Sequence, residues 1–204
     1  MITKLDEELR YLFEQPQICN NCIGHGFCCQ RSACNCHPTD FDNDVQKMEK
    51  ALETGKYAID FVRSTADSFI RKGCNYILDV EHILQTEEES LYIRPRNRDR
   101  PIVDLIHPEE DGHEGPCVLW SYEKGCELSY DERPMFGRHM IASENPEWCS
   151  SFYDIPEKRG MIKKLRTDWK PYTMDLFRLA QKFFDENWQY YRMLSIDLRQ
   201  ANIG

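Results

Sequence analysis

Thiol and imidazole side chains, the groups that bind zinc and iron in proteins, are concentrated in one short stretch of this chain. Residues 19–37 hold six cysteines and two histidines among glycines and asparagines, with no long apolar run. This composition predicts a loop. A loop that buries so few apolar side chains needs cross-links, either disulfide bonds or a metal centre. Its candidate ligands are Cys19, Cys22, Cys28, Cys29, Cys34, Cys36, His25 and His37.

The spacing of these cysteines bears on the kind of centre. Cys19 and Cys22 are separated by two residues, so one tight turn directs both sulfurs to the same ion. Cys28 and Cys29 are adjacent, and neighbouring side chains diverge in an extended backbone. These two sulfurs therefore suit separate ions, or separate corners of a cluster, which favours a polynuclear centre or two centres. Cysteine ligands suit both zinc and an iron–sulfur cluster such as 4Fe–4S. The sequence does not decide between these two centres, and we prefer the iron–sulfur cluster.

Further cysteines lie downstream at Cys117, Cys126 and Cys149. We expect a hairpin over residues 117–130 to share metal ligands with loop 19–37, so that metal binding stabilises the fold. His25 and His37 are interpreted as further ligands, as donors to the thiolates, or as solvated turn residues.

Length and composition predict a single domain over residues 1–204, in which a helical segment over 151–204 packs on a cysteine-cluster core over 1–150. Ten cysteines in 204 residues are fewer than in disulfide scaffolds. The N-terminus is charged and amphipathic, unlike a signal peptide. We therefore expect a cytoplasmic protein, and in a reducing compartment a dense thiol cluster indicates a metal site rather than a disulfide knot.

Charge and hydropathy exclude two classes of partner. The net charge of −9, from 26 basic and 35 acidic residues, argues against binding to nucleic acid or to anionic membranes. No apolar stretch approaches the roughly 18 residues that a membrane span requires. The expected partners are metal ions, with a protein partner or a small anionic substrate as further options.

Alternating arginines form a second pattern, at Arg94, Arg96, Arg98 and Arg100. In an extended chain all four would lie on one side. Such a strip could bind a phosphate, a carboxylate or an acidic partner. The alternative, which we favour, is an edge strand protected by charge and proline.

Periodicity predicts the elements that position these side chains. Helices are expected over 3–14, from Asp40 to Leu52, over 57–72, over 161–169 and after Pro171. Strands are expected over 76–78, 91–94 and 102–106, and in the hairpin. The last helix carries an apolar face, interpreted as core, at Leu176, Ala180, Phe183, Phe184, Trp188, Tyr191 and Leu194. The expected fold is α+β and helix-dominated, with a metal-bound cysteine loop, a small irregular antiparallel sheet and a helical C-terminus.

Three motifs together resemble the YkgJ-type cysteine-cluster family. They are Cys19-x-x-Cys22 followed by Cys28-Cys29; Gly115-Pro-Cys117-Val-Leu; and Cys126-Glu-Leu-Ser-Tyr130-x-x-Arg133-Pro134-x-x-Gly137-Arg138. The resemblance covers about residues 17–140. The family is described as a zinc- or iron-chelating domain with a CxxCxxxCC signature. It implies ligand roles for Cys19, Cys22, Cys28, Cys29, Cys117 and Cys126.

This chain departs from the family pattern at two places. Five residues, rather than three, separate CxxC from the adjacent cysteines. The family also carries a cysteine after Arg-Pro-x-x, where this chain has Gly137. The missing thiol is expected to come from Cys34, Cys36 or Cys149.

Three functions follow from these observations. The first is a cytoplasmic metal-binding protein that serves redox chemistry, sensing or metal handling. The second is an iron–sulfur-dependent enzyme that modifies a protein or a small molecule, because the resemblance extends to flagellin lysine N-methylases. The third and least favoured is a secreted disulfide protein. No catalytic residue can be assigned, and whether the protein is an enzyme stays open.

Overall fold

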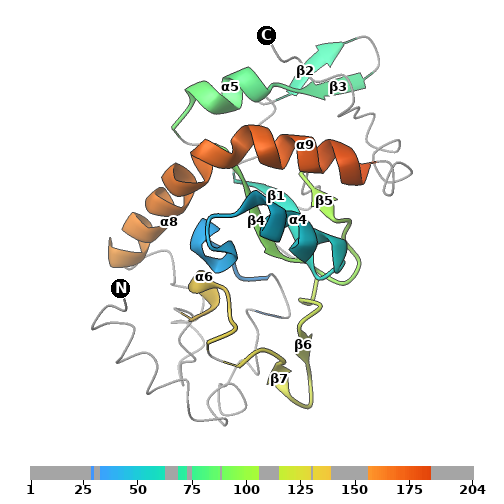
Figure 1. Ribbon diagram of the computed structural model, residues 1–204, viewed down its shortest axis with the longest axis vertical. Coiled ribbons are helices and arrows are strands. Elements are labelled where there is room, and N and C mark those ends of the chain that lie inside the picture. Colours follow the sequence, from blue (N-terminus) through green and yellow to red (C-terminus); the bar gives the residue numbers. More distant parts are fainter. Residues whose placement is uncertain are drawn as a thin grey trace.

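The computed structural model describes residue 29 and residues 33–62, 69–72, 75–87, 89–105, 115–129, 131–138 and 156–184. These ranges form an α+β fold in which helices pack on a small sheet (Figure 1). The helices are η1 (Pro38–Phe41), α4 (Val45–Glu53), α5 (Val80–Gln85), α6 (Met135–Arg138), α8 (Pro156–Trp169), η4 (Lys170–Tyr172) and α9 (Thr173–Phe184). The strands are β1 (Tyr57–Val62), β2 (Phe69–Lys72), β3 (Asn75–Leu78), β4 (Ser90–Pro95), β5 (Val103–Asp104), β6 (Trp120–Ser121) and β7 (Gly125–Cys126).

A three-stranded sheet of order β4-β1-β5 forms the centre of the described structure. Strand β1 runs antiparallel to β4 and parallel to β5, and Ile59 lies opposite both Ile93 and Val103. The sheet is therefore mixed, which corrects the prediction of an antiparallel sheet. Side chains alternate between the two faces of a strand. The buried apolar residues at odd-numbered positions of β1, β4 and β5 therefore share one face of the sheet. This face belongs to the main hydrophobic core.

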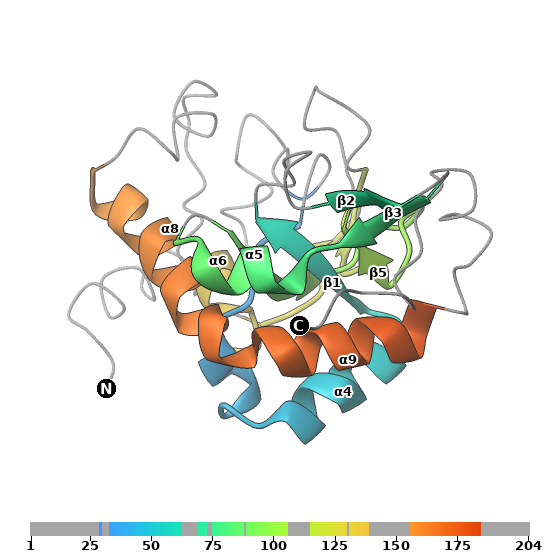
Figure 2. The same cartoon turned by 90° about the horizontal axis from the view of Figure 1, so that it is seen from above.

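Helices cover this sheet. α4 contacts β1, whereas α8 and α9 contact β4. α4 and α9 lie side by side in both views (Figures 1 and 2), and Lys182 of α9 binds Glu49 and Glu53 of α4 at 2.6 and 3.1 Å. The inner face of α9 is buried at Leu176, Phe177, Ala180, Phe183 and Phe184. Apolar residues three and four apart place one stripe against the core.

Two hairpins extend from the central body at opposite ends (Figure 1). β2 pairs with β3 next to α5, while β6 pairs with β7 near α6. The β6–β7 hairpin is short: Trp120 lies opposite Cys126, and Ser121 opposite Gly125. Among the described residues, no helix is both long and apolar enough to cross a bilayer.

The predicted helix over 57–72 is wrong. Residues 57–62 form β1, residues 69–72 form β2, and 63–68 lie outside the described residues. Gly55, with φ of +68°, follows the end of α4. Tyr57, Ile59 and Phe61 occupy every second position of β1 and so share one face. The backbone of β1 forms its hydrogen bonds with the antiparallel strand β4. Long-range pairing outweighs the helical spacing of the apolar residues, because local propensity is a weak preference.

Several other predictions are confirmed, with shifted boundaries. Residues 76–78 and 91–94 lie in β3 and β4, the hairpin is present, and the C-terminal helices are α8 and α9. The predicted strand 102–106 is limited to β5 in the described part. The helix expected from Asp40 is divided into η1 and α4, and Asp44 caps α4. The helix 3–14 and the residues Trp188, Tyr191 and Leu194 lie outside the described residues.

Candidate metal centre

Thiols from two distant parts of the chain, the segment with Cys29 and Cys34 and the segment with Cys117 and Cys126, lie near one another beside the β6–β7 hairpin. The backbone N–H of Cys117 donates to the carbonyl of Cys29 at 2.7 Å. Cys117 also forms a bridge with Asn97, and Val118 N–H donates to the Arg96 carbonyl at 2.9 Å. These hydrogen bonds hold the start of the hairpin segment between the end of β4 and Cys29.

Cys34 has the thiols of Cys29, Cys117 and Cys126 as electrostatic neighbours. Burial raises the pKa of the Cys34 thiol well above its ordinary value, and the negative charges of Cys29, Cys117, Cys126 and Asp40 raise it further. Charges that shift one another's pKa lie within a few ångströms to about one screening length. Cys34, Cys36, Cys117 and Cys126 are thiols and form no disulfide.

Gly137 of α6 contacts Cys34. A Cβ placed on Gly137 would lie 3.0 Å from the Sγ of Cys34 and 3.5 Å from its Cβ. The Cys34 thiol therefore occupies the space that a side chain at position 137 would need. The close approach of Cys34 to the backbone of α6 explains why position 137 is a glycine, and no unusual backbone geometry is needed.

Cys117 is held in a buried environment. It packs with Ala33, Leu119 and Trp120 in a second, smaller apolar cluster, against which Cys29 also lies. Burial raises the pKa of Cys117 to about 11, although the N–H of Leu119, at 3.4 Å from its sulfur, lowers it. Backbone N–H groups directed at sulfur are a common second shell of thiolate ligands.

Cys36, like Cys34, has thiols as electrostatic neighbours, namely those of Cys34 and Cys117, but its packing differs. It is 0% exposed and belongs to the main core. Its N–H donates to the Ile93 carbonyl of β4, and its carbonyl accepts from Nε1 of Trp169, both at 3.0 Å. This residue fixes the cysteine segment between the sheet edge and α8, so its environment is that of a packing residue.

His37 is also part of the framework. Its Nε2 lies 2.7 Å from Asp168 of α8, and its Nδ1 lies 2.8 Å from the hydroxyl of Thr39. Both ring nitrogens thus have protein partners, and the side chain caps η1. These contacts give His37 a capping role, and the ligand role stays a prediction.

Asp40 links the cysteine segment to α6, a role that the sequence did not reveal. Its carboxylate accepts the N–H of His37 at 2.8 Å and the N–H of Met135 at 2.9 Å. Burial raises the pKa of Asp40, while these two hydrogen bonds lower it. Because Met135 begins α6, Asp40 holds that helix in place and sets Gly137 against Cys34. The sequence indicated Asp40 only as a cap for the following helix.

The four arginines do not form one strip, in contrast to the extended conformation predicted. β4 ends at Pro95 and the chain then turns, with Arg100 N–H donating to the Asn97 carbonyl at 3.1 Å. Arg94 is buried between Asp60 and Asp104, and Arg100 binds Asp104 at 2.6 Å.

The remaining two arginines also bind protein groups. Arg96 donates to the Gly55 carbonyl at 2.6 Å, and Arg98 donates to the Trp120 carbonyl. Backbone and side-chain groups of the fold thus bind all four guanidinium groups, which favours a structural role over an anion site.

The described side chains do not form a complete coordination sphere. Within the described ranges, no group of three or more His, Cys, Asp or Glu side chains is arranged to hold a metal ion. Several predicted ligands lie outside these ranges, namely Cys19, Cys22, Cys28, Cys149 and His25. The donor chemistry suits zinc or an iron–sulfur cluster, and the described thiols are neighbours that are not in coordinating positions.

Comparisons with protein-family models, with curated proteins and with solved structures give no match to this chain.

Proposed function

We propose that this protein binds metal through its clustered cysteines, as an iron–sulfur cluster or as zinc, between the segments that carry Cys29, Cys34, Cys117 and Cys126. The approach of these distant segments carries the proposal: the Cys117 N–H donates to the Cys29 carbonyl at 2.7 Å, and Cys34 has the thiols of Cys117 and Cys126 as electrostatic neighbours. Four cysteines are a frequent ligand set for both kinds of centre. The role would be redox chemistry, sensing or metal handling in a reducing compartment such as the cytoplasm.

Electrostatics supports a metal at this position. Several thiols and Asp40 lie close together, and each negative charge raises the pKa of Cys34. Without a cation, the raised pKa values of Cys34 and Cys117 keep these two thiols protonated. A metal cation stabilises the deprotonated thiols, and its binding energy then becomes folding energy.

The proposed ligand set combines described and undescribed residues. Cys29, Cys117 and Cys126 carry over from the family resemblance, together with Cys19, Cys22 and Cys28. Cys34 is proposed to replace the family cysteine expected at position 137, because its sulfur lies where that side chain would project. Cys36 is proposed as a core residue. Rotation of side chains would accompany binding, since the described thiols are not in coordinating positions.

Metal analysis of protein purified without oxygen tests this proposal. We expect stoichiometric iron with broad absorption near about 400 nm, or stoichiometric zinc in colourless protein. Absence of both metals from folded protein would refute the proposal. In that case, an absence of free thiols after denaturation would indicate the disulfide alternative.

A matched pair of variants tests the choice of ligand. Cys34→Ala is expected to lose much of the metal per folded chain, because it removes a sulfur from the thiol cluster. Cys36→Ala changes a cysteine two residues away that packs in the core, and it should keep the metal. Equal metal content in Cys34→Ala and the wild type would exclude Cys34 as a ligand.

A further inference from the structure

A cavity of about 310 Å³ lies beside the thiol cluster. Its walls come from η1, from the first residue of β1 and from residues 131–138. Cys36 and Asp40 line it, and Asp40 is also close enough to Cys34 to raise the pKa of that thiol. The cavity and the proposed metal centre therefore share one chain segment. Its volume is at the lower end of the range of about 300–1,000 Å³ for small-molecule sites.

The lining of the cavity combines apolar and charged groups. Phe41 and Tyr57 contribute aromatic rings, with ring centroids 6.0 Å apart and nearly perpendicular planes. Arg133 and Arg138 contribute positive charge. A few polar groups next to an apolar wall are typical of sites that orient a small ligand.

Arg138 has a donor that finds no acceptor among the described residues. Its Nε is shielded from solvent and has no hydrogen-bond partner in the part of the chain that the structure describes. Its Nη2 lies 3.4 Å from Asp40, at the limit of a hydrogen bond. A buried donor without a partner destabilises the folded state. The Arg138 side chain is 32% exposed, and a small rotation of it would let an oxyanion in the cavity accept from Nε and Nη2 together.

The acidic residues around the cavity do not prevent this use. Asp40 already accepts the N–H groups of His37 and Met135, which offset its charge. Glu132 is exposed and accepts from the N–H and hydroxyl of Ser129 at 3.0 and 2.8 Å. Asp131 is exposed as well, and water and salt screen exposed charges.

We propose that this cavity binds the carboxylate or phosphate group of a small molecule, with Arg138 as its anchor, next to the clustered thiols. The bound molecule would be a substrate or an effector of the metal centre. That second statement rests on the proposed function, whereas the binding to Arg138 does not. Such a site favours the cluster-dependent enzyme as the second candidate function.

Titration with inorganic phosphate and with acetate, at constant ionic strength and in the full-length protein, tests the site. We expect one saturable site per chain by calorimetry and a rise in melting temperature, with chloride as the inactive reference. The anion with the higher affinity identifies the group that is recognised. No saturable binding of either anion would overturn the proposal.

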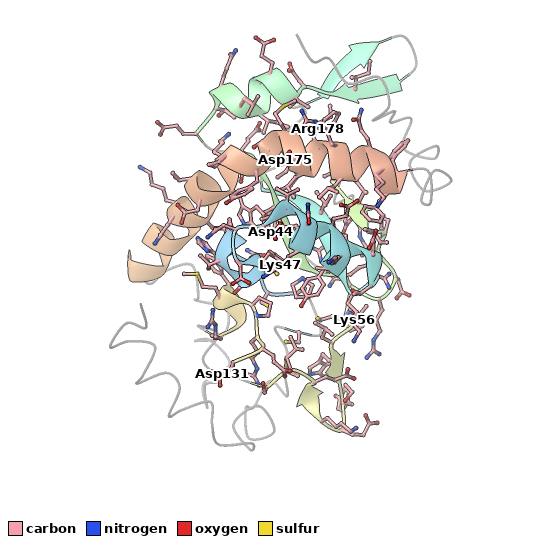
Figure 3. The ribbon with its side chains drawn as sticks, in the orientation of Figure 1. Asp44, Lys47, Lys56, Asp131, Asp175 and Arg178 are labelled. Atoms are coloured by element: carbon pink, nitrogen blue, oxygen red, sulfur yellow. The ribbon has the colours of Figure 1, made fainter. Side chains whose placement is uncertain are left out.

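Variants locate the binding at Arg138. Arg138→Gln is expected to weaken affinity at least about tenfold, and Arg138→Lys less, because lysine keeps the charge but loses the two-pronged donor. Arg178→Gln is the matched control: this arginine is exposed on α9, where it binds Asp175 at 3.2 Å. In Figure 3 Arg178 lies at the other end of the molecule from Asp131, which lines the cavity. Equal affinity in Arg138→Gln and Arg178→Gln would contradict the assignment.

A measurement on unaltered protein guards against variants that fail to fold. The preferred anion should protect Arg138, but not Arg178, from modification by phenylglyoxal, as detected by peptide mass spectrometry. Equal modification of Arg138 with and without the anion would refute the site. Protein that holds metal but binds no anion refutes this inference alone, and protein that binds anion but no metal refutes only the proposed function.

Discussion

At the scale of single residues, neighbouring cysteines have different environments. Cys34 faces other thiols and Gly137, whereas Cys36 is enclosed by the main core. Two positions of separation bring a side chain to the same side of an extended chain, but the irregular backbone here lets the two sulfurs reach different surroundings. The ligand role proposed for Cys34 depends on this difference.

Gly137→Ala tests the contact between α6 and Cys34. Overpacking by the new methyl group costs about 1–3 kcal/mol, and the better helix propensity of alanine returns about 0.5–1 kcal/mol. We therefore expect a net loss of about 1 kcal/mol, measured by urea unfolding of metal-free protein. The metal content of this variant should also fall, because the Cys34 sulfur is displaced.

The double variant Cys34→Ala/Gly137→Ala provides the control. It removes the sulfur that the new methyl group meets, so the stability lost in Gly137→Ala should return while the metal content stays low. A Gly137→Ala protein at least as stable as the wild type would contradict the close contact.

At the scale of elements, the C-terminal end of α8 positions the cysteine segment. Trp169 donates to the Cys36 carbonyl at 3.0 Å, and Asp168 lies 2.7 Å from Nε2 of His37. Trp169 is 0% exposed and packs near Phe41 and Tyr172. The helix therefore connects the thiol cluster to the hydrophobic core, and loosening this connection should affect the centre.

Trp169→Phe removes one donor from this connection. The Cys36 carbonyl loses its partner, which costs about 1–3 kcal/mol, so we expect lower stability and faster transfer of metal to a chelator. Phe177→Leu is the matched control, because Phe177 is equally buried in the core and its ring takes no part in these hydrogen bonds. That variant should lose stability without a comparable change in metal transfer. Identical transfer rates in the two variants would refute the positioning role of α8.

At the scale of the whole molecule, two kinds of force hold distant segments together. The main core joins the sheet to α4, α8 and α9 through apolar burial. The β6–β7 hairpin belongs to a much smaller cluster of Ala33, Cys117, Leu119 and Trp120. Because buried apolar area sets the hydrophobic contribution, the hairpin region has less of it and depends more on hydrogen bonds and on the proposed metal.

Cys126→Ser tests this dependence. Structural metal centres contribute on the order of 10 kcal/mol to folding, so loss of one ligand should lower the metal content and the melting temperature together. Glu123→Gln, in the exposed turn of the same hairpin, should change neither. After removal of metal by a chelator, wild type and Cys126→Ser should melt at nearly the same temperature. Loss of metal at an unchanged melting temperature would show that metal and fold are not coupled.

The sequence by itself determined the chemistry that is available and the elements whose pattern is local. The types and order of the thiols are fixed by the chain, and the apolar face of α9 is predictable because residues three and four apart share one side of a helix. β4 and the short hairpin also follow from residues of strand character and from turn residues. These features depend on neighbours along the chain.

Only the tertiary structure decided the features that depend on distant partners. Residues 57–62 become a strand because β4 and β5 pair with them. Arg94 is buried because Asp60 and Asp104 meet it there, and Gly137 matters because Cys34 fills the space beside it. The physical reason is that strand pairing, burial and close approach depend on residues far away in the sequence. The periodicity of neighbouring residues carries no information about these distant partners.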